Sequence, residues 1–436
     1  MKRLLALAAS ALALSPAPAA AQDLVVTNAK LVLGDGSEPL DGATLVVRDG
    51  KVTAAGRDIS VPADLPTIDA AGAWVTPGLF ASVTTLGIWD VGAVSQSNDI
   101  RASDAPFGAA LDTAPIVNPA SQHIAIHRAA GITRAATTVM PSSSIFAGQG
   151  AIIDLDSDGT PVMERKAFQM VDLGEAGGRI AGGSRAASYA LFRAALREAE
   201  VLSGRRGLPR TPEIAQEGDL LLSRFDAEAL VPVVTGRQPL YVAVERAADI
   251  RSVLALRSDF PKLDLVLVGA SEGWLVAPEI AAAGVPVIAD GLDALPTGFD
   301  QLGATQSNIG RMTAAGVTVA INAASAENPR NIQQFAGNLV GLARIPGASG
   351  LSWGQAFAAI SSVPAEISGY GGRAGVFKRG ALGDVVIWDG DPLEVGSIPT
   401  RVFIDGVEQD LTSHQSRLKE RFRDLDESDL PKAYDW

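Results

Sequence analysis

The 436-residue chain contains no cysteine. Disulfide bonds, thiol catalysis and lipid attachment through a cysteine are therefore excluded, and the fold must be stabilised by its core. Positive charge is also scarce, because 36 Lys and Arg stand against 49 Asp and Glu, which gives a formal net charge of -13. This acidity argues against nucleic acid and against anionic membranes as partners.

A long apolar run is missing as well. The run at residues 4–14 follows Lys2 and Arg3 and is too short to span a bilayer. Small residues then lead to an Ala-x-Ala pattern at residues 19–21, which is typical of a cleaved secretory signal. We therefore expect residues 1–21 to be removed and the protein to be periplasmic or secreted, without membrane contact. The mature chain would carry 34 basic and 49 acidic residues, a net charge of -15.

Both ends of the remaining chain show short β-branched strands separated by tight turns. Asp49-Gly50 is one such turn, and residues 383–407 show the same pattern. An Asp-Gly pair between alternating apolar residues is a hairpin signal. Neither group is large enough to form a domain alone. We expect residues 22–74 and 375–412 to pair into one small β-sandwich.

The middle of the chain, residues 75–374, alternates apolar strands with helices at intervals suited to βα units. Strands are expected at residues 131–135, 240–244, 263–268, 283–289 and 315–321, and helices at residues 184–202, 250–257 and 277–283. The pattern predicts an α/β fold with a TIM (β/α)8 barrel, whose site lies at the C-terminal strand ends. Residues 413–436 form a tail, with a charged, solvent-facing helix expected at residues 413–425.

Two motifs carry a family resemblance. Residues 75–87 (VTPGLFASVTTLG) and residues 382–394 (LGDVVIWDGDPLE) resemble the amidohydrolase superfamily, in the branch of imidazolonepropionases and related exported amidohydrolases. The resemblance covers nearly all of the mature chain and is weakest at residues 174–239. It implies a barrel with a composite β-sandwich, and a metal at the mouth that hydrolyses C–N bonds.

The metal ligands that this resemblance implies are absent. Val83 and Thr85 stand where a His-x-His pair is expected, and Asn322 stands where an aspartate is expected. The fifth and sixth strands end at Glu245 and Gly269 instead of histidines. The whole chain has three histidines, and metal-dependent members of the family spend about that many on ligation alone. We therefore expect no zinc and no ordinary metal-dependent amide hydrolysis.

Three other motifs leave alternatives open. His123 and His127 lie one helical turn apart, so they either bind a metal or, as we favour, lie on a helix surface. Asp154, Asp156 and Asp158 match half of a calcium loop, but Arg165 stands at the twelfth position and a hairpin turn explains them equally well.

The third motif is Gly-Ala-Ser-Glu-Gly at residues 269–273, which fits the nucleophile elbow of a serine hydrolase built on Ser271. That mechanism needs a downstream histidine, and only His414 in the tail is available. The motif also coincides with the expected end of the sixth barrel strand.

Glu245 and Asp290 are the carboxylates expected at the strand ends, with Glu327 in a later loop. They could act as acid and base, or fill the vacated metal pocket through salt bridges and hydrogen bonds, which we favour. The candidate ligand pocket consists of Thr85, Glu245, Arg246, Asp290, Asn322 and Arg330.

The sequence thus predicts an exported amidohydrolase-like protein without a metal site, which binds a small molecule or a protein partner and does not catalyse. The alternatives are a C–N hydrolase with a degenerate or metal-free site and a serine hydrolase. The ligand and any homo-oligomeric state are left open by residue types alone.

Overall fold

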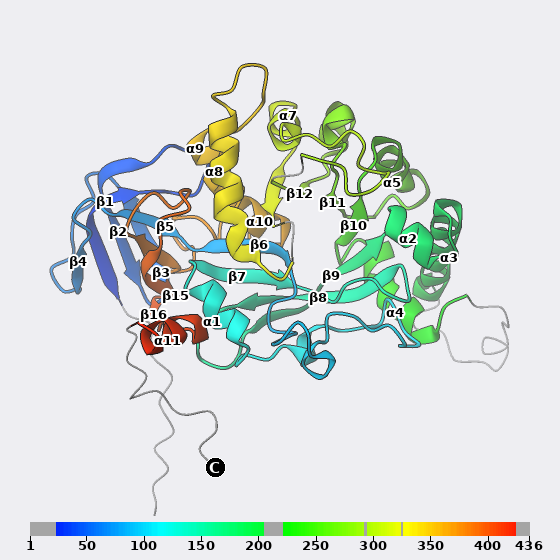
Figure 1. Ribbon diagram of the computed structural model, residues 1–436, viewed down its shortest axis with the longest axis horizontal. Coiled ribbons are helices and arrows are strands. Elements are labelled where there is room, and N and C mark those ends of the chain that lie inside the picture. Colours follow the sequence, from blue (N-terminus) through cyan, green and yellow to red (C-terminus); the bar gives the residue numbers. More distant parts are fainter. Residues whose placement is uncertain (1–22, 205–220, 292–293, 324–325, 424–436) are drawn as a thin grey trace, which may run out of the picture.

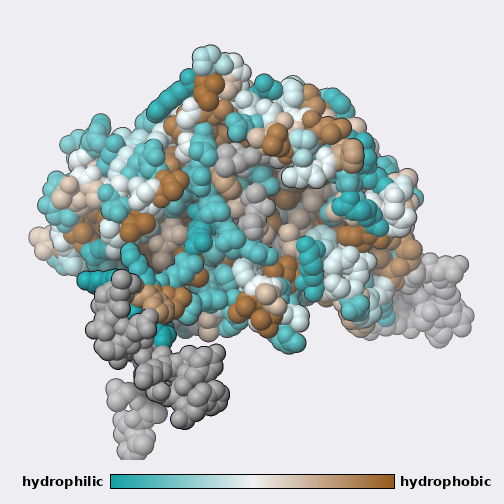
Figure 2. Space-filling model, in the orientation of Figure 1, coloured by the Kyte–Doolittle hydropathy of each residue, from teal (hydrophilic) through white to brown (hydrophobic). Residues whose placement is uncertain are grey.

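The computed structural model describes residues 23–204, 221–291, 294–323 and 326–423, and the expected signal segment lies outside them. Two sheets organise the molecule, one at the left of Figure 1 and one at its centre and right. Hydrophilic and hydrophobic side chains are interspersed over the face seen in Figure 2. In the described part of the chain, no helix has the length and apolar character needed to cross a membrane.

The first sheet is built from both ends of the chain, in the order β16-β15-β14-β5-β1-β2-β3, with β4 paired to β1. Its strands are β1 (Leu24–Leu31), β2 (Leu40–Arg48), β3 (Lys51–Gly56), β4 (Thr67–Asp69), β5 (Trp74–Pro77), β14 (Val385–Trp388), β15 (Pro399–Ile404) and β16 (Val407–Glu408). The predicted turn between β2 and β3 has Asp49 and Gly50 at φ of 49° and 69°, which favours a tight hairpin.

Strands β5 and β14 join the two ends, with Val385 opposite Pro77 and Trp388 opposite Trp74 in antiparallel register. The pairing expected between the N- and C-terminal strands is therefore present. The strands form one hydrogen-bonded sheet, and the two-layered sandwich stays a prediction.

The second sheet is the eight-stranded barrel, in the order β13-β12-β11-β10-β9-β8-β7-β6. Its strands are β6 (Leu79–Thr84), β7 (Ile132–Thr137), β8 (Phe146–Asp154), β9 (Val162–Asp172), β10 (Leu240–Val244), β11 (Leu265–Gly269), β12 (Val287–Asp290) and β13 (Val319–Asn322). Strand β13 returns to contact β6, so the barrel is nearly closed. Side chains alternate between its two faces, and Tyr241 stacks on Phe168 at 4.3 Å inside the barrel.

The barrel departs from regular (β/α)8 alternation at one strand. Strand β8 runs antiparallel to both β7 and β9, and no helix lies between these three strands. A parallel crossover needs a dozen or more residues, whereas residues 138–145 form a much shorter link. The short link therefore reverses the chain direction, which the periodicity of the sequence did not reveal.

The remaining strands alternate with helices that cover the barrel (Figure 1). The helices are α1 (Gln122–Arg128), α2 (Glu175–Ile180), α3 (Arg185–Gly204), α4 (Arg224–Val234), α5 (Ala247–Asp259), α6 (Ala277–Ala283), α7 (Asn308–Ala314), α8 (Ile332–Leu342), α9 (Trp353–Ala358), α10 (Ser362–Ile367) and α11 (His414–Arg421). Helix α11 starts at a Ser413 capping box and buries none of its residues, as expected for the tail helix.

A buried ion pair ties the barrel to the terminal sheet. Arg134 of β7 is 1% exposed, and its Nε and Nη2 donate to the two carboxylate oxygens of Asp384 at 2.8 and 2.9 Å. Its Nη2 also lies 2.8 Å from Asp405 in the β15–β16 turn. Arg134 therefore connects one barrel strand to two segments of the terminal sheet.

Asp154, at the end of β8, lies at the edge of this junction. Its Oδ2 is 3.9 Å from Arg134, whereas its buried Oδ1 has no hydrogen-bond partner in the described chain. Burial, with repulsion from Asp156, raises the pKa of Asp154 to about 8 despite the nearby arginine. The carboxyl group is therefore largely protonated near neutral pH.

We expect Asp154→Asn to stabilise the protein at pH 8.5 by about 1–3 kcal/mol and to have little effect at pH 4. The pKa of Asp154 is higher in the folded protein than in the unfolded chain. The stability that the protonated carboxyl group contributes is therefore complete below about pH 4 and is lost as the pH rises through about 8. Urea unfolding at both pH values measures the difference. Asp158→Asn serves as the control of opposite sign, because bonds from Thr160 lower the pKa of Asp158. A pH-independent effect of Asp154→Asn would contradict the expectation.

Candidate functional site

The candidate site is the barrel mouth, where the parallel strands end. Thr85 follows β6, Glu245 follows β10, Gly269 ends β11, and Asp290 and Asn322 end β12 and β13. Asp290 and Asn322 are register partners on neighbouring strands, and both are half-buried. Five of the predicted positions thus lie at the same end of the barrel, because parallel strands present their carboxyl ends together.

Glu245 fills the space in which a side chain at position 269 would lie. This position is the end of β11, the strand that the sequence predicts as the sixth of the barrel. A Cβ atom on Gly269 would lie 2.2 Å from Oε1 of Glu245, and Gly269 has a φ of +91°. Oε2 of Glu245 accepts hydrogen bonds from the backbone N–H and the hydroxyl of Ser271, at 2.9 and 2.6 Å. The carboxylate is therefore held by protein donors at the point where the family resemblance implies a histidine.

The other implied ligand positions are equally unsuited to a metal. Val83 is 3% exposed and packs among apolar side chains of the barrel interior. Within the described ranges, no three His, Cys, Asp or Glu side chains are grouped to hold a metal ion. The residues at the mouth thus do not fit the metal that the fold implies.

Asp172 is a mouth carboxylate that the sequence reasoning missed. It ends β9, and its Oδ1 accepts the backbone N–H groups of Gly174 and Gly177 at 2.9 and 3.0 Å. Burial raises the pKa of Asp172, while these two bonds oppose the rise. An acid at the end of an apolar stretch and two residues before Gly174 was the available signal. Its carboxylate anchors the start of α2.

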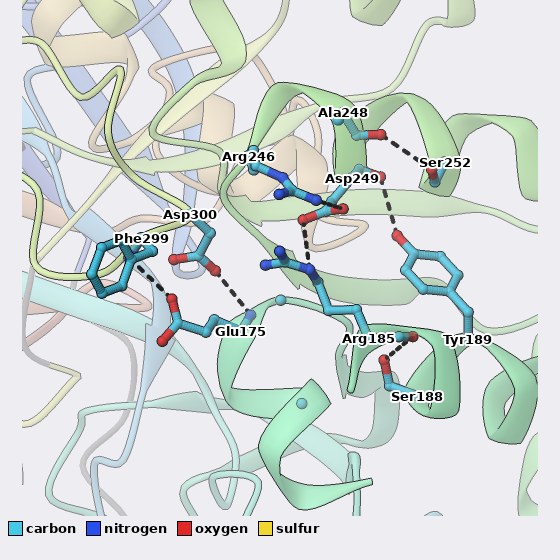
Figure 3. Close-up of polar contacts among 12 residues, drawn as sticks. Glu175, Arg185, Ser188, Tyr189, Arg246, Ala248, Asp249, Ser252, Phe299 and Asp300 are labelled. Atoms are coloured by element: carbon cyan, nitrogen blue, oxygen red, sulfur yellow. Dashed lines mark hydrogen bonds and ion pairs between the residues drawn. The ribbon is translucent and has the colours of Figure 1, made fainter. Parts of the chain in front are cut away.

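Arg246 belongs to a polar network on the rim, shown in Figure 3. Its Nη2 donates to Asp249 at 2.9 Å, and Arg185 of α3 lies 3.5 Å from the same carboxylate. Beside this pair, Asp300 accepts the backbone N–H of Glu175 at 2.9 Å. Arg246 is thereby held at the start of α5.

An open pocket of about 430 Å³ lies on the opposite side of the mouth, near the ends of β6, β7 and β13. It is lined by Thr85, Gly92, Ala93, Ser95, Asn98, Ile100, Arg101, Met140, Ala326 and Glu327. Of the predicted pocket residues, only Thr85 lines it. Arg101 was missed because it lies in an irregular loop, where no periodicity marks its position.

Thr85 forms a backbone hydrogen bond, whereas its side-chain hydroxyl has no hydrogen-bond partner in the described structure. Its N–H donates to the carbonyl of Ala326 at 3.1 Å, which fastens the loop after β13 to the end of β6. The residue is 1% exposed, and its Oγ1 has no partner within the described structure. A buried hydroxyl without a partner is unfavourable and unusual in native proteins.

Arg330 lies away from the pocket. It follows the loop after β13, and its Nη1 donates to Gln415 of the tail helix α11 at 3.3 Å. Its charge also acts on His127 of α1. The loop therefore carries Arg330 past the mouth to the outside of the barrel, which sequence proximity to Asn322 could not indicate.

The expectation that both α1 histidines lie on the surface is wrong for His127, which is 1% exposed. Its Nδ1 lies 2.7 Å from the carbonyl oxygen of His123, and its Nε2 has no partner in the described chain. Burial lowers the pKa of His127 to about 4, so the ring is neutral at pH 7. His123 stacks on Trp89 with ring centroids 3.6 Å apart.

The remaining two motifs have local structural roles. Ser271 is 3% exposed and donates to Glu245, whereas His414 lies on α11, which is well apart from β11 in Figure 1. Asp156 and Asp158 lie in the β8–β9 hairpin turn, where they accept backbone N–H groups two residues ahead.

Superposition on solved structures of known proteins shows which fold this chain has. An amidohydrolase of Thermotoga maritima superimposes with a TM-score of 0.76 over 88% of this chain and 99% of its own, at 22% identity. The chain has the amidohydrolase fold. A molinate hydrolase superimposes over 90% of this chain and 95% of its own, at 15% identity and a TM-score of 0.54. A prolidase complexed with N-methylphosphonate-L-proline covers 89% and 99%, at 14% identity and a TM-score of 0.53.

Sequence similarity to curated proteins is confined to short segments. An amidohydrolase of Hapsidospora irregularis is 45% identical over 60 residues, and a deacetylase of Brucella anthropi is 42% identical over 60 residues. These matches span 14% and 13% of this chain and only 6% and 15% of the relatives. No family model matches the chain. The amidohydrolase fold is thus combined with a mouth that lacks the expected ligand residues.

Proposed function

We propose that this protein is an exported, amidohydrolase-like binding protein that holds a small molecule at the barrel mouth without a metal and without catalysis. One observation carries the proposal: Glu245, bonded to Ser271, fills the space beside Gly269. A ligand histidine at this position would overlap that carboxylate. The proposal is further supported by Val83 and Asn322, which replace nitrogen and carboxylate donors by groups that bind divalent cations poorly.

Metal content after saturation tests the proposal. We expect the protein, dialysed against Zn²⁺ or Mn²⁺ and then desalted, to retain far less than one equivalent of metal. Elemental analysis by mass spectrometry measures the content. A His123→Ala, His127→Ala variant is the control, because metal that it no longer retains was bound to α1 and not at the mouth. One retained equivalent in this variant, or chelator-sensitive amide or dipeptide hydrolysis, would overturn the proposal.

A second candidate function is metal-free hydrolysis of C–N bonds, with Glu245 and Asp290 as acid and base. It is favoured by the amidohydrolase and deacetylase names of the curated relatives and by the 2.6 Å contact between Glu245 and a hydroxyl. If it holds, Glu245→Gln lowers the turnover of an amide substrate about 100-fold or more while the circular dichroism spectrum is kept. Glu366→Gln, at an exposed glutamate away from the mouth, is the matched control. An unchanged rate in Glu245→Gln would exclude this role.

A further inference from the structure

We propose that the pocket beside Thr85 binds a small zwitterion, whose carboxylate lies against Arg101 and whose ammonium group lies against Glu327. This inference rests on the proposed function and specifies the ligand class. It starts from the charges of the lining residues. Among them, Arg101 is the only cation and Glu327 is the only carboxylate, and the others are neutral.

The two charges are available to a ligand. Nη1 of Arg101 donates to the backbone carbonyl of Pro141 at 2.8 Å, which orients the guanidinium group without neutralising it. Within the described chain, neither Arg101 nor Glu327 forms an ion pair at 4.0 Å or less. A ligand with a single charge would leave one of these groups uncompensated in the pocket. A ligand with both charges compensates both.

Thr85 supplies the neutral contact that fixes the ligand between the charges. Its buried Oγ1 has no protein partner, and the residue lines the same pocket. The hydroxyl can donate to a carboxylate or accept from an ammonium group. Because Oγ1 is buried in the free protein, a ligand reaches it only when the pocket wall shifts, and that contact satisfies the hydroxyl.

The size of the pocket and its apolar walls limit the ligand further. A volume of about 430 Å³ is at the lower end of the range for small-molecule sites. Ile100 and Met140 add apolar surface to the lining. An amino acid with an apolar side chain, or a similarly small derivative, matches these features.

On the opposite side of the mouth, the charged side chains are mostly bonded within the protein. There, Glu245 is bonded to Ser271, and Asp172 is bonded to two backbone N–H groups. Arg246 is paired with Asp249. Most polar atoms on that side are therefore engaged by the protein, with Nε of Arg246 as an exception in the described chain, whereas the pocket beside Thr85 presents two charges of opposite sign without an ion pair.

Isothermal titration calorimetry with matched triplets tests the inference. Each triplet contains an amino acid such as L-leucine or L-valine, its N-acetyl derivative without the ammonium group, and its amide without the carboxylate. We expect the best zwitterion to bind about 10- to 100-fold more tightly than both of its derivatives, since each lost charge removes a charge-assisted bond. Equal affinity within every triplet, or no binding of any zwitterion, would overturn the inference.

Two pocket variants assign the charges. Arg101→Gln should abolish the preference for the zwitterion over its amide, and Glu327→Gln should abolish the preference over the N-acetyl derivative. Arg379→Gln and Glu366→Gln change exposed residues outside the pocket and should leave both preferences intact. If either pocket variant keeps the preference that it should lose, the assignment of that charge is wrong.

Thr85→Val provides a readout that separates binding from folding. We expect the variant to melt at a higher temperature than the wild type in the absence of ligand, because it removes a buried hydroxyl without a partner. The same variant should bind the zwitterion about 3- to 10-fold more weakly. A lower melting temperature without ligand, or unchanged affinity, would contradict the role of Thr85.

The outcomes also separate this inference from the function on which it rests. A metal-free protein that binds only anions or only amines at the mouth overturns the zwitterion and leaves metal-free binding intact. A protein that retains one equivalent of zinc at the mouth overturns the proposed function itself.

Discussion

Arg134→Ala is expected to lower the free energy of unfolding by about 3–5 kcal/mol, the largest effect that we expect of a single substitution in this protein. The variant leaves the carboxylate of Asp384, which is 1% exposed, without its bidentate partner. It also removes the link between β7 and the β15–β16 turn. Urea unfolding followed by tryptophan fluorescence measures the change, since Trp388 lies buried in the same sheet as Asp384.

The matched control is Arg48→Ala, which breaks the exposed pair between Arg48 and Asp64. An exposed ion pair contributes between about 0 and 1 kcal/mol, so this variant should unfold close to the wild type. Arg134→Met with Asp384→Leu tests the cause, because replacing both partners removes the unpaired charge and should recover part of the loss. A loss below about 1 kcal/mol in Arg134→Ala would show that the pair does not hold the two sheets together.

Gly269→Ala is expected to destabilise the protein by about 2–4 kcal/mol through two separate effects. The new Cβ atom would lie 2.2 Å from the Glu245 carboxylate, which must move away from Ser271. The left-handed φ of +91° adds a strain of roughly 1–2 kcal/mol for any residue with a Cβ atom. The free energy of unfolding in urea measures the sum.

Gly316→Ala separates these two effects. Gly316 has a φ of +90°, and a Cβ atom there would meet nothing within 4 Å. The control variant should therefore show only the backbone strain of about 1–2 kcal/mol. In the background of Glu245→Ala, the excess loss of Gly269→Ala over Gly316→Ala should shrink. Equal losses at the two glycines in the wild-type background would show that Glu245 does not fill the space beside Gly269.

The Gly269 result bears directly on function. If Glu245 fills this position, the imidazole of Gly269→His must displace its carboxylate from Ser271, and we expect that the variant does not restore a metal site. The mouth then differs from a metal-dependent hydrolase by its packing as well as by its missing residues. Metal-free binding is favoured by this difference.

The sequence by itself determined the elements whose cause is local. Strand β10 was predicted at its observed bounds of residues 240–244 because it is a short continuous apolar run, and helix α6 was predicted at residues 277–283, where Pro278 lies in the first turn and Gly284 follows the last residue. The replacement of expected ligands at Val83 and Asn322 was equally visible, since an apolar side chain cannot coordinate in any fold and a neutral amide is a weaker ligand than a carboxylate.

Tertiary structure alone decided how distant residues meet. The antiparallel direction of β8, the burial of His127 and the course of Arg330 past the mouth all depend on loops without periodicity. The pocket joins Thr85 and Arg101 of the connection after β6 to Glu327 of the loop after β13. Residue types specify which chemistry is available, but only the closure of the barrel specifies which groups face each other, because contacts between distant segments arise from packing and not from local pattern.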